Sequence, residues 1–384
     1  RYTMQFCGAG RTSRWAGRLF QPQNLLRPMH KAAEIELFIA AIKNDCLDLI
    51  TDNVMSATGS CARGAIIAEE GHKLYVSDLS NIEGRAAAWL AGETWKLKAF
   101  KAYDEGRGHD LYRLAYATAF DMDIDDVDGG EDKGPQRQVG KVLELLMQYE
   151  GGVGAFLTGA ATYKIDLDDL ARVAWPSIPR EIREKSAETY EWMTSRRRST
   201  FGLERKTYIV CDSLKTMWRQ KHPAISSYWK ELSDAARNAI LNPGVPVRAR
   251  KIVFLRKGAW LKAKMPSGRI LQYASPRVEG FKLSYKGQNQ FTRKWKRIDT
   301  YGGEVLENFS QKIARDVMAD NMKPIESAGY NVILSVHDEL LTEAEDNQSF
   351  SARHLSELLS TNPEWAEGLP LAAGGFEAYR YRKD

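Results

Sequence analysis

The order of hydrophobic and polar positions in the first hundred residues predicts a helix, a strand and a second helix. Residues 30–51 carry apolar side chains at every third or fourth position, which is typical of an amphipathic helix. Residues 73–77 form a short run with β-propensity, and 81–92 again follow the helical period. Between the second helix and the middle of the chain, residues 121–132 are strongly acidic and are expected to form a loop.

The middle of the chain is predicted to form helices first and then short β-like runs. A helix is predicted to begin at Pro135 and to run toward 151, because proline is favoured in the first turn and Gly151 and Gly152 follow. Residues 165–240 are helical and charged, whereas 247–299 mix short β-like runs with basic loops.

The last part of the chain predicts one long helix and two strands. The helix covers about 303–322, and the strands cover 331–336 and 339–343 with a tight turn between them.

Composition excludes several classes of protein. With 384 residues, 43% of them hydrophobic and 27% charged, the chain is expected to fold into about two to three domains and is unlike disordered, collagen-like or membrane sequences. No apolar run of about 18 residues and no signal-peptide pattern occur, so we expect a cytoplasmic protein with no membrane partner.

The four cysteines form no CxxC pair and the six histidines no HExxH pair, so neither a zinc site nor a disulfide framework is predicted. Because the first residue is not Met, we expect the C-terminal part of a longer protein.

Charge is distributed unevenly along the chain. The net charge is only +5, but residues 247–299 contain fifteen Lys or Arg against two acidic residues, a balance of +13, and six Lys or Arg precede the first acidic residue, Glu34. Aromatic residues are interleaved with these cations: Trp15, Phe20, Trp260, Tyr273, Tyr285 and Trp295. Cations alternating with rings favour a nucleic acid as partner, although solvated surface charge is the alternative.

Two aspartates stand where strands end. Asp78 follows the strand at 73–77, and Asp338 lies in the turn between the last two strands. Two carboxylates brought together by adjacent strands would suit a pair of Mg²⁺ ions in phosphoryl transfer. For either residue taken singly, the favoured explanation is the tolerance of Asp for turns.

The helix that begins at Pro135 carries a regular row of functional residue types. Arg137, Lys141, Leu145 and Tyr149 recur every four residues and are expected to share one helix face. Two cations followed by an aromatic ring suit a nucleoside triphosphate. The alternative is that the cations are solvated while Leu145 and Tyr149 pack in the core.

Other charged groups have simpler interpretations. Ser80 and Glu83 fit a capping box, and the alternative is that Glu83 stands beside the sugar of a bound nucleotide. The acidic loop departs from a calcium-binding loop at Asp126 and Asp132, so calcium binding is not expected. Residues 196–198, three arginines, are interpreted as a solvated face.

Taken in order, these motifs resemble those of the family A, or DNA polymerase I-like, DNA polymerases. Residues 77–85 resemble motif A, whose pattern is Asp-Tyr-Ser-Gln-Ile-Glu-Leu-Arg; 137–151 resemble motif B of the fingers helix; and 336–339 resemble motif C, the His-Asp-Glu turn. Residues 10–18 and 21–25 are similar to the segment that contacts primer and template. The resemblance covers nearly the whole chain and is strongest to phage and prophage members.

The resemblance implies a two-metal catalytic centre. Asp78 and Asp338 would bind two Mg²⁺ ions, and Glu339 would support the metal site. Lys141 would protonate the departing pyrophosphate.

The resemblance also implies a nucleotide pocket. Arg137 and Lys141 would bind the triphosphate, Tyr149 would stack at the pocket, and Glu83 would exclude a ribose 2′-hydroxyl. Leu145 stands where many members have Phe or Tyr, a departure that bears on discrimination at the sugar 3′ position.

Primer and template would be contacted by residues from three segments. His337 and Arg14 would hold the primer end, Gln23 and Asn24 belong to the primer-template segment, and Gln311 would contact the minor groove.

The resemblance implies the α+β class and the architecture of a right-hand polymerase, which has a palm of antiparallel sheet plus helices and inserted helical fingers. Residues 1–95 would form the first part of the palm, 96–300 the fingers and 301–384 the second part of the palm. The thumb and the exonuclease domain lie upstream of these motifs in the family, so we expect both to be absent from this chain and DNA binding by the chain alone to be weak.

The function implied is template-directed addition of deoxynucleotides to a primer 3′ end in phage or prophage DNA replication, in the cytoplasm of a bacterial host. Its partners would be primed DNA and dNTPs, together with an upstream thumb or exonuclease region or a processivity factor, and the chain would be a monomer. The alternatives are a truncated nucleic-acid-binding remnant with little catalysis and an enzyme that uses ribonucleotides or RNA.

Overall fold

The computed structural model describes residues 4–18, 21–26, 28–128, 134–289 and 292–382. Phe20 and Asp132, which entered the sequence interpretation, lie outside these ranges. The chain divides into two compact units. The first comprises 1–82, 314–367 and 371–384; the second comprises 83–313 and 368–370.

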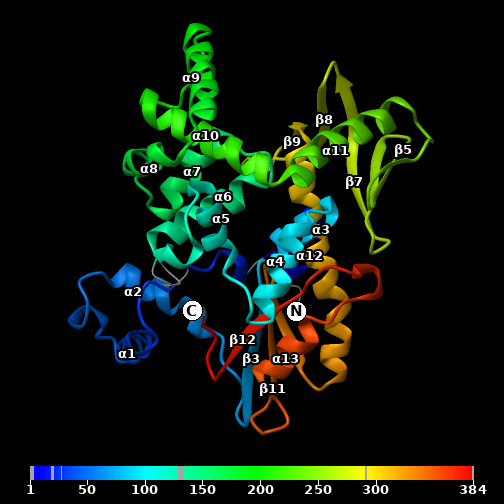
Figure 1. Cartoon of the computed structure of the whole chain (residues 1–384). Coiled ribbons are helices and arrows are strands. Elements are labelled where there is room, and N and C mark those ends of the chain that lie inside the picture. The colour runs from blue at the N-terminus through cyan, green and yellow to red at the C-terminus, as the bar shows by residue number, and fades with distance from the viewer. Residues whose placement is uncertain (1–3, 19–20, 27, 129–133, 290–291, 383–384) are drawn as a thin grey trace. The chain divides into compact units, whose positions relative to one another are not determined.

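The first unit is built on a four-stranded antiparallel sheet. Its order is β10-β11-β3-β12, with β3 (His72–Leu79) in the interior, β11 (Glu339–Glu345) and β12 (Ala373–Ala378) on either side, and β10 (Asn331–Val336) at one edge. Strands from both ends of the chain therefore lie side by side, as Figure 1 shows for the blue and red arrows. The predicted strands at 73–77, 331–336 and 339–343 are all present.

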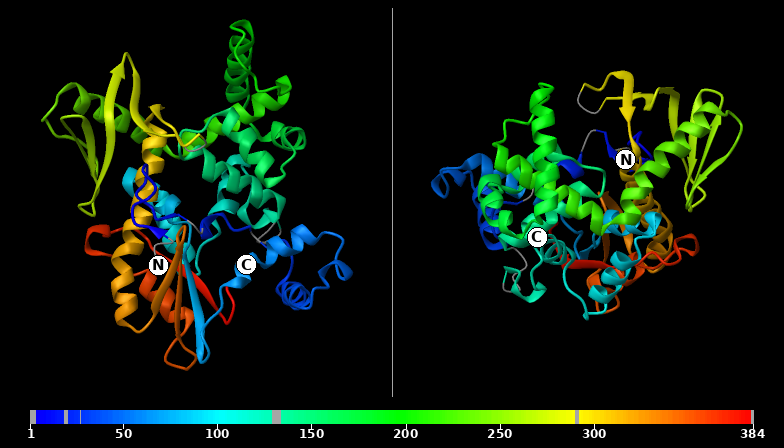
Figure 2. Two further views of the ribbon diagram at one scale, coloured as in Figure 1. Left: turned by 180° about the vertical axis from the view of Figure 1, so that it is seen from behind. Right: turned by 45° about the horizontal axis from the view of Figure 1, so that its top comes forward.

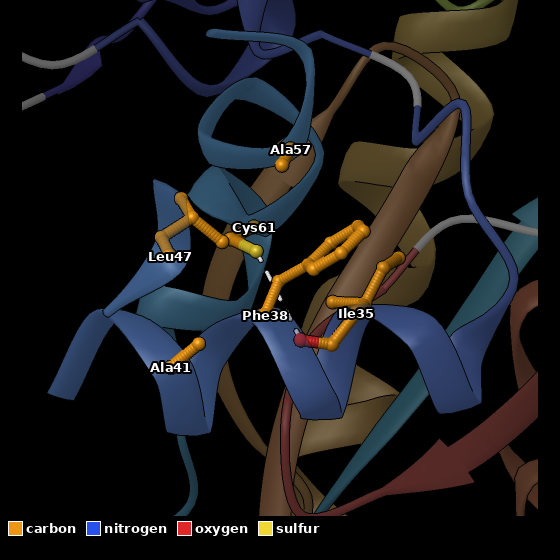
Figure 3. Packing of buried hydrophobic residues seen from close by; sticks show 6 residues of the cluster. All are labelled: Ile35, Phe38, Ala41, Leu47, Ala57 and Cys61. Atoms are coloured by element: carbon orange, nitrogen blue, oxygen red, sulfur yellow. Dashed lines mark hydrogen bonds between the residues drawn. The ribbon is translucent and has the colours of Figure 1, made fainter. Parts of the chain in front are cut away.

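Helices and a second small core complete this unit. Helix α13 (Ala352–Leu359) packs against β3 and β12, and the hydroxyls of Ser77 and Ser356 are 2.8 Å apart at that contact. Helices α1 (Ala32–Lys43) and α2 (Val54–Cys61) enclose a separate apolar cluster (Figure 3), in which the Cys61 thiol donates a weak hydrogen bond to the Ile35 carbonyl. A two-stranded ribbon, β1 (Met4–Gln5) with β2 (Ala16–Gly17), precedes them.

The first predicted helix is shorter than expected. Its apolar period continues to Ile50, but α1 ends at Lys43 because Asp45 adopts a left-handed backbone conformation, with φ of 52°. Short 3-10 turns, one of them directly after this break, cover Pro22–Asn24, Leu47–Leu49, Ala62–Ala65, Ile124–Asp126, Trp175–Ser177 and Glu364–Ala366.

The second unit begins with helices. They are α3 (Ile82–Ala91), α4 (Thr94–Asp104), α5 (Leu111–Phe120), α6 (Pro135–Met147), α7 (Val153–Tyr163), α8 (Leu167–Ala174), α9 (Arg180–Ser195), α10 (Arg205–Lys221) and α11 (Pro223–Leu241). Helices α5 and α6 cross closely because Gly140 has no side chain: a Cβ there would lie 1.8 Å from the Tyr112 carbonyl oxygen.

A buried charged group lies among these helices. Lys96 forms an ion pair with Glu144 of α6, and both side chains are at most 5% exposed. The other carboxylate oxygen of Glu144 accepts a hydrogen bond from Trp218 Nε1 at 2.9 Å and lies 3.3 Å from His222 Nε2. Burial alone would raise the pKa of this carboxyl, but Lys96 and His222 outweigh it and hold the pKa well below its usual range.

The second unit ends in a six-stranded antiparallel sheet that packs against α11 (Figure 2). Its strands follow chain order: β4 (Val247–Ala249), β5 (Ile252–Lys257), β6 (Trp260–Lys264), β7 (Ile270–Glu279), β8 (Lys282–Gln288) and β9 (Trp295–Thr300). The short β-like runs expected over 247–299 are thus parts of one continuous meander, and the region between 96 and 300 is less purely helical than predicted. The long predicted helix is α12 (Gly302–Ser327), which enters the first unit at Ala314.

Candidate active site

Two of the predicted catalytic carboxylates lie opposite each other in the first unit. Asp78 is near the end of β3, and its cross-strand partner on β11 is Glu339. Directly opposite residues in a sheet point to the same face, so both carboxylates lie on one face of the sheet. On the other side of β3 the partner of Asp78 is Gly374, which adds no side chain beside it.

Asp338 is joined to the same strand through its backbone. Its carbonyl accepts a hydrogen bond from the Leu79 amide at 3.1 Å, so the turn between β10 and β11 is fixed beside the end of β3. His337, the first residue of this two-residue turn, has φ of 57°. Asp78 and Asp338 are both half-buried and come from neighbouring strand ends, as the sequence predicted.

Glu339 is buried, with 3% of its surface exposed, and is held by side chains from distant parts of the first unit. The Tyr381 hydroxyl donates a hydrogen bond to Glu339 Oε1, and Arg63 Nη1 donates to the Tyr381 oxygen at 2.8 Å. Burial and the neighbouring Glu339 raise the pKa of the Tyr381 hydroxyl, so it remains a donor at neutral pH. The orientation of the Glu339 carboxyl group is therefore fixed.

The chemistry of this donor set fits a hard divalent cation. Carboxylate oxygens from two adjacent strand ends are the ligands that Mg²⁺ uses together with water and substrate phosphates, without a complete protein cage. No cluster of three or more His, Cys, Asp or Glu side chains suited to a metal occurs within the described ranges.

Arg137, the first predicted nucleotide-binding residue, forms a bidentate ion pair in the second unit. Its Nε and Nη2 donate to the two carboxylate oxygens of Asp110, each at 3.0 Å, and the guanidinium lies 5.0 Å from the Tyr112 ring centroid. Asp110 also caps α5 by accepting hydrogen bonds from the amides of Tyr112 and Arg113. Asp110 was not predicted, because the 27 residues that separate it from Arg137 leave no local signal.

Lys141 and Leu145 occupy the helix face expected from the four-residue spacing. Both are half-buried on α6, and Lys141 Nζ lies 4.9 Å from the ring centroid of Tyr163. Val142 and Leu143 of the same helix are fully buried.

Tyr149 lies beyond the end of α6, which is shorter than the predicted helix. Helix α6 ends at Met147, and Tyr149 lies in the turn that follows. This turn is held by α10, α11 and α12. Arg219 Nη2 of α10 donates to the Glu150 carbonyl at 3.3 Å, and Trp229 Nε1 of α11 donates to the Gln148 carbonyl at 3.0 Å. The Gly303 amide of α12 donates to a carboxylate oxygen of Glu150 at 3.0 Å. A Cβ on Gly303 would lie 2.2 Å from the Tyr149 carbonyl oxygen, so only glycine allows this approach.

Glu83 and Gln311, predicted to act on the sugar and on the minor groove, are neighbours in the second unit. Gln311 Nε2 lies 3.4 Å from Glu83 Oε2 and 3.3 Å from Glu307 Oε1. One amide therefore joins the first turn of α3 to α12.

The predicted primer-template residues lie in the first unit. His337 Nε2 is 3.2 Å from the Gln23 carbonyl, which can only accept, so Nε2 carries the proton in this contact. Asn24 Nδ2 donates to Gln21 Oε1 at 2.7 Å, and the Arg14 amide donates to Thr12 Oγ1 at 3.4 Å.

A buried arginine that the sequence did not reveal packs against two aromatic rings in the segment around Arg14. Arg315 of α12 is 2% exposed, and its guanidinium lies 4.5 Å from the Phe6 ring centroid and 4.6 Å from that of Trp15. Arg315 was missed because a single cation on a long charged helix does not stand out.

Comparison with solved structures gives the class of protein. The chain resembles the polymerase domain of Pol1 from M. smegmatis, in complex with DNA primer-template and dNTP, with a TM-score of 0.54 over 96% of this chain and 46% of that chain. At 17% sequence identity this likeness establishes the fold: an α+β polymerase domain, as predicted.

The sequence gives a nearer relative. The chain is 31% identical, over 99% of its length, to a DNA polymerase of Bacillus phage SP02. These two findings confirm the resemblance to phage DNA polymerases of family A. The chain spans about half the length of this relative, 52%. No protein-family model matches the chain. No helix among the described residues is long and apolar enough to cross a membrane.

Proposed function

We propose that this chain catalyses template-directed addition of deoxynucleotides to the 3′ end of a DNA primer. The observation that carries the proposal is the pairing of Asp78 with Glu339, beside a turn whose Asp338 carbonyl is bonded to the same strand. The kinship with a phage DNA polymerase supports it.

Asp78 and Asp338 would hold two Mg²⁺ ions, with Glu339 fixed beside them by Tyr381. When bound, such ions would acidify the primer 3′-hydroxyl and neutralise charge on the triphosphate. The 3′ oxygen would attack the α-phosphorus, and the bond from that phosphorus to the departing pyrophosphate would break. Lys141 would donate a proton to the pyrophosphate.

The remaining residues would bind and orient the substrates. Arg137 and Lys141 would contact the triphosphate, Tyr149 would stack at the nucleotide, Leu145 would lie near its sugar, and Glu83 would exclude a 2′-hydroxyl.

Contacts with primer and template would come from His337 and Arg14 at the primer end, from Gln23 and Asn24, and from Gln311 in the minor groove. Such a site works mainly by positioning and charge neutralisation.

The proposed architecture keeps the three parts expected from the sequence: palm from 1–95 and 301–384, and fingers from 96–300. We further propose that the chain works as a monomer in the bacterial host cytoplasm during phage DNA replication. A thumb or exonuclease region, or a processivity factor, would supply the grip on duplex DNA.

Primer extension tests the proposal. Purified chain is incubated with a primed DNA template, Mg²⁺ and dNTPs, beside Asp338→Ala and the control Asp169→Ala, whose carboxylate is exposed on α8 and pairs with Arg172. We expect extension by wild type and Asp169→Ala, and a loss of at least about a hundredfold in Asp338→Ala.

A folded wild-type chain that binds primed DNA but adds no nucleotide at any Mg²⁺ concentration would contradict the proposal. It would favour the alternative, a nucleic-acid-binding remnant.

A further inference from the structure

The six-stranded sheet of the second unit has one packed face and one open face. Phe254, Leu261 and Tyr273 are at most 5% exposed and line a small cavity together with Ala236 and Ile240 of α11. Because successive residues of a strand point to opposite faces, their neighbours in sequence lie on the open face.

The open face is rich in lysine. Four lysines lie there: Lys257, Lys262, Lys264 and Lys286. Lys262 and Lys264 alternate along β6 with the buried Leu261 and Ala263. Lys257 and Lys286 share the face of Trp260 because the cross-strand pairs Lys257–Trp260, Trp260–Ala274 and Ala274–Lys286 form one row. Three of the four are exposed and Lys262 is half-buried. Among the described residues, no ion pair joins any of the four to an acidic side chain.

Acidic residues on this face are few. Asp299 is paired with Lys282 at 2.9 Å, and Glu279 lies at the end of β7. The electrostatic potential of the open face is therefore positive.

Two tryptophans lie on the same face. Trp260 is 42% exposed, and its cross-strand neighbours are Lys257 and Ala274. Trp295 is 62% exposed and lies opposite Gln288, which is two residues from Lys286 and so shares its face. Three strand spacings and two residues separate the two tryptophans, or about 16 Å from standard sheet dimensions. Within the described part of the chain neither indole contacts another ring.

We propose that this open face binds single-stranded DNA, with the four lysines along the phosphates and the two indoles stacked on bases. The proposal rests on the proposed function in taking DNA as the nucleic acid.

The side chains distinguish a single strand from a duplex. A duplex offers phosphates to lysine but keeps its bases stacked inside, so exposed indoles gain little from it. A single strand offers both phosphates and free base faces, and stacking platforms among cations are the usual way of binding it without sequence preference.

Fluorescence anisotropy of a labelled oligo(dT) of about 16 nucleotides tests the proposal on the full chain. We expect Trp260→Ala/Trp295→Ala to raise the Kd at least about tenfold, because stacking on each ring contributes appreciably to affinity. Replacing the four lysines with alanine should weaken binding and reduce the slope of log K against log salt by roughly 3, since each phosphate contact on a single strand contributes about 0.7.

A matched control comes from α9, where Lys185 is exposed and Trp192 is 47% exposed. Lys185→Ala/Trp192→Ala should bind oligo(dT) like wild type. Thermal melting of all variants verifies the fold, and Asp338→Ala should retain oligo(dT) binding even if catalysis is lost, so failure of the proposed function and failure of this proposal are distinguishable.

Two outcomes would overturn the proposal. In one, the sheet variants bind oligo(dT) as tightly as wild type. In the other, they lose as much affinity for a blunt duplex as for oligo(dT), which would make the face a duplex-binding surface.

Discussion

Asp110 holds the guanidinium of Arg137 with both carboxylate oxygens, each 3.0 Å from its nitrogen partner. Both side chains are largely buried, at 15% and 19% exposure. In this arrangement two of the five N–H donors of Arg137 are directed at a carboxylate and not at a phosphate. If Arg137 binds the triphosphate, Asp110 competes with the nucleotide for it.

Asp110→Asn should therefore tighten nucleotide binding. The amide still caps α5, since Asn and Asp are equivalent at that position, while the charge that competes for Arg137 is removed. We expect the KM for dNTP to fall about fivefold, equivalent to about 1 kcal/mol, with kcat little changed. Steady-state primer extension measures both. A rise in KM would instead mean that Asp110 positions Arg137 for the substrate.

Glu83→Ala separates the two interpretations of this residue. As a gate, its loss should reduce discrimination against ribonucleotides by at least about tenfold and leave the unfolding free energy nearly unchanged. As a helix cap, its loss should cost about 1 kcal/mol and leave sugar selectivity unchanged. We expect the first result. Single-nucleotide incorporation of rATP against dATP and chemical denaturation measure the two effects, and Gln311→Ala tests whether the amide contact at 3.4 Å contributes to selectivity.

Tyr381→Phe should weaken catalysis although Tyr381 is not expected to touch substrate. The phenylalanine keeps the ring over which Arg63 lies but removes the hydroxyl that bonds Glu339. A buried carboxylate then loses its donor, and we expect about 1–3 kcal/mol of destabilisation. If Glu339 supports the metal site, kcat also falls several-fold and the Mg²⁺ dependence of the rate shifts to higher concentration. A destabilised variant with wild-type Mg²⁺ dependence would show that Tyr381 is only structural.

Glu144→Ala should destabilise the second unit strongly. Lys96 is fully buried, so removal of its partner leaves an uncompensated charge, and we expect a loss of about 3–5 kcal/mol in urea denaturation. Lys96→Met/Glu144→Leu removes both charges and should recover most of that loss. Equal destabilisation of the single and double variants would contradict this account.

The same group gives the chain a defined acid response. The pKa of the folded Glu144 carboxyl is lowered, so its contribution to stability is fully present above the unfolded pKa of about 4.5 and is lost as pH falls toward the folded value. Below pH 4.5 the unfolding free energy of wild type should therefore fall, relative to that of Lys96→Met/Glu144→Leu, as the pH is lowered.

Local patterns in the sequence were sufficient for the elements that carry the carboxylates. Runs with β-propensity and a tight turn placed the strands that carry Asp78 and flank Asp338, and the helical period placed Lys141 and Leu145 on one face. The same period was extended too far in two places. It continued beyond Lys43, where a left-handed Asp45 ends α1, and beyond Met147, where the turn around Tyr149 is fixed by contacts with α10, α11 and α12.

Partners that come from distant parts of the chain could not be predicted. Asp110, Tyr381 and Arg315 each act through a contact that only the tertiary fold creates. The sheet of the second unit was recognised only as short β-like runs, although the turns at Gly258 and Gly280, both with positive φ, mark its hairpins. These short runs form one sheet because each strand from β4 to β9 pairs with the next.

The strand that carries Asp78 pairs with Glu339, which lies 261 residues later in the chain, and with Gly374 on its other side. During synthesis this strand leaves the ribosome long before either partner exists, so it stays unpaired until residues 339–345 and 373–378 have been made. The two carboxylate motifs can pair only after residue 339 has been synthesised. A product terminated before residue 338 would carry α6 and the six-stranded sheet of the second unit but only one of the two aspartates.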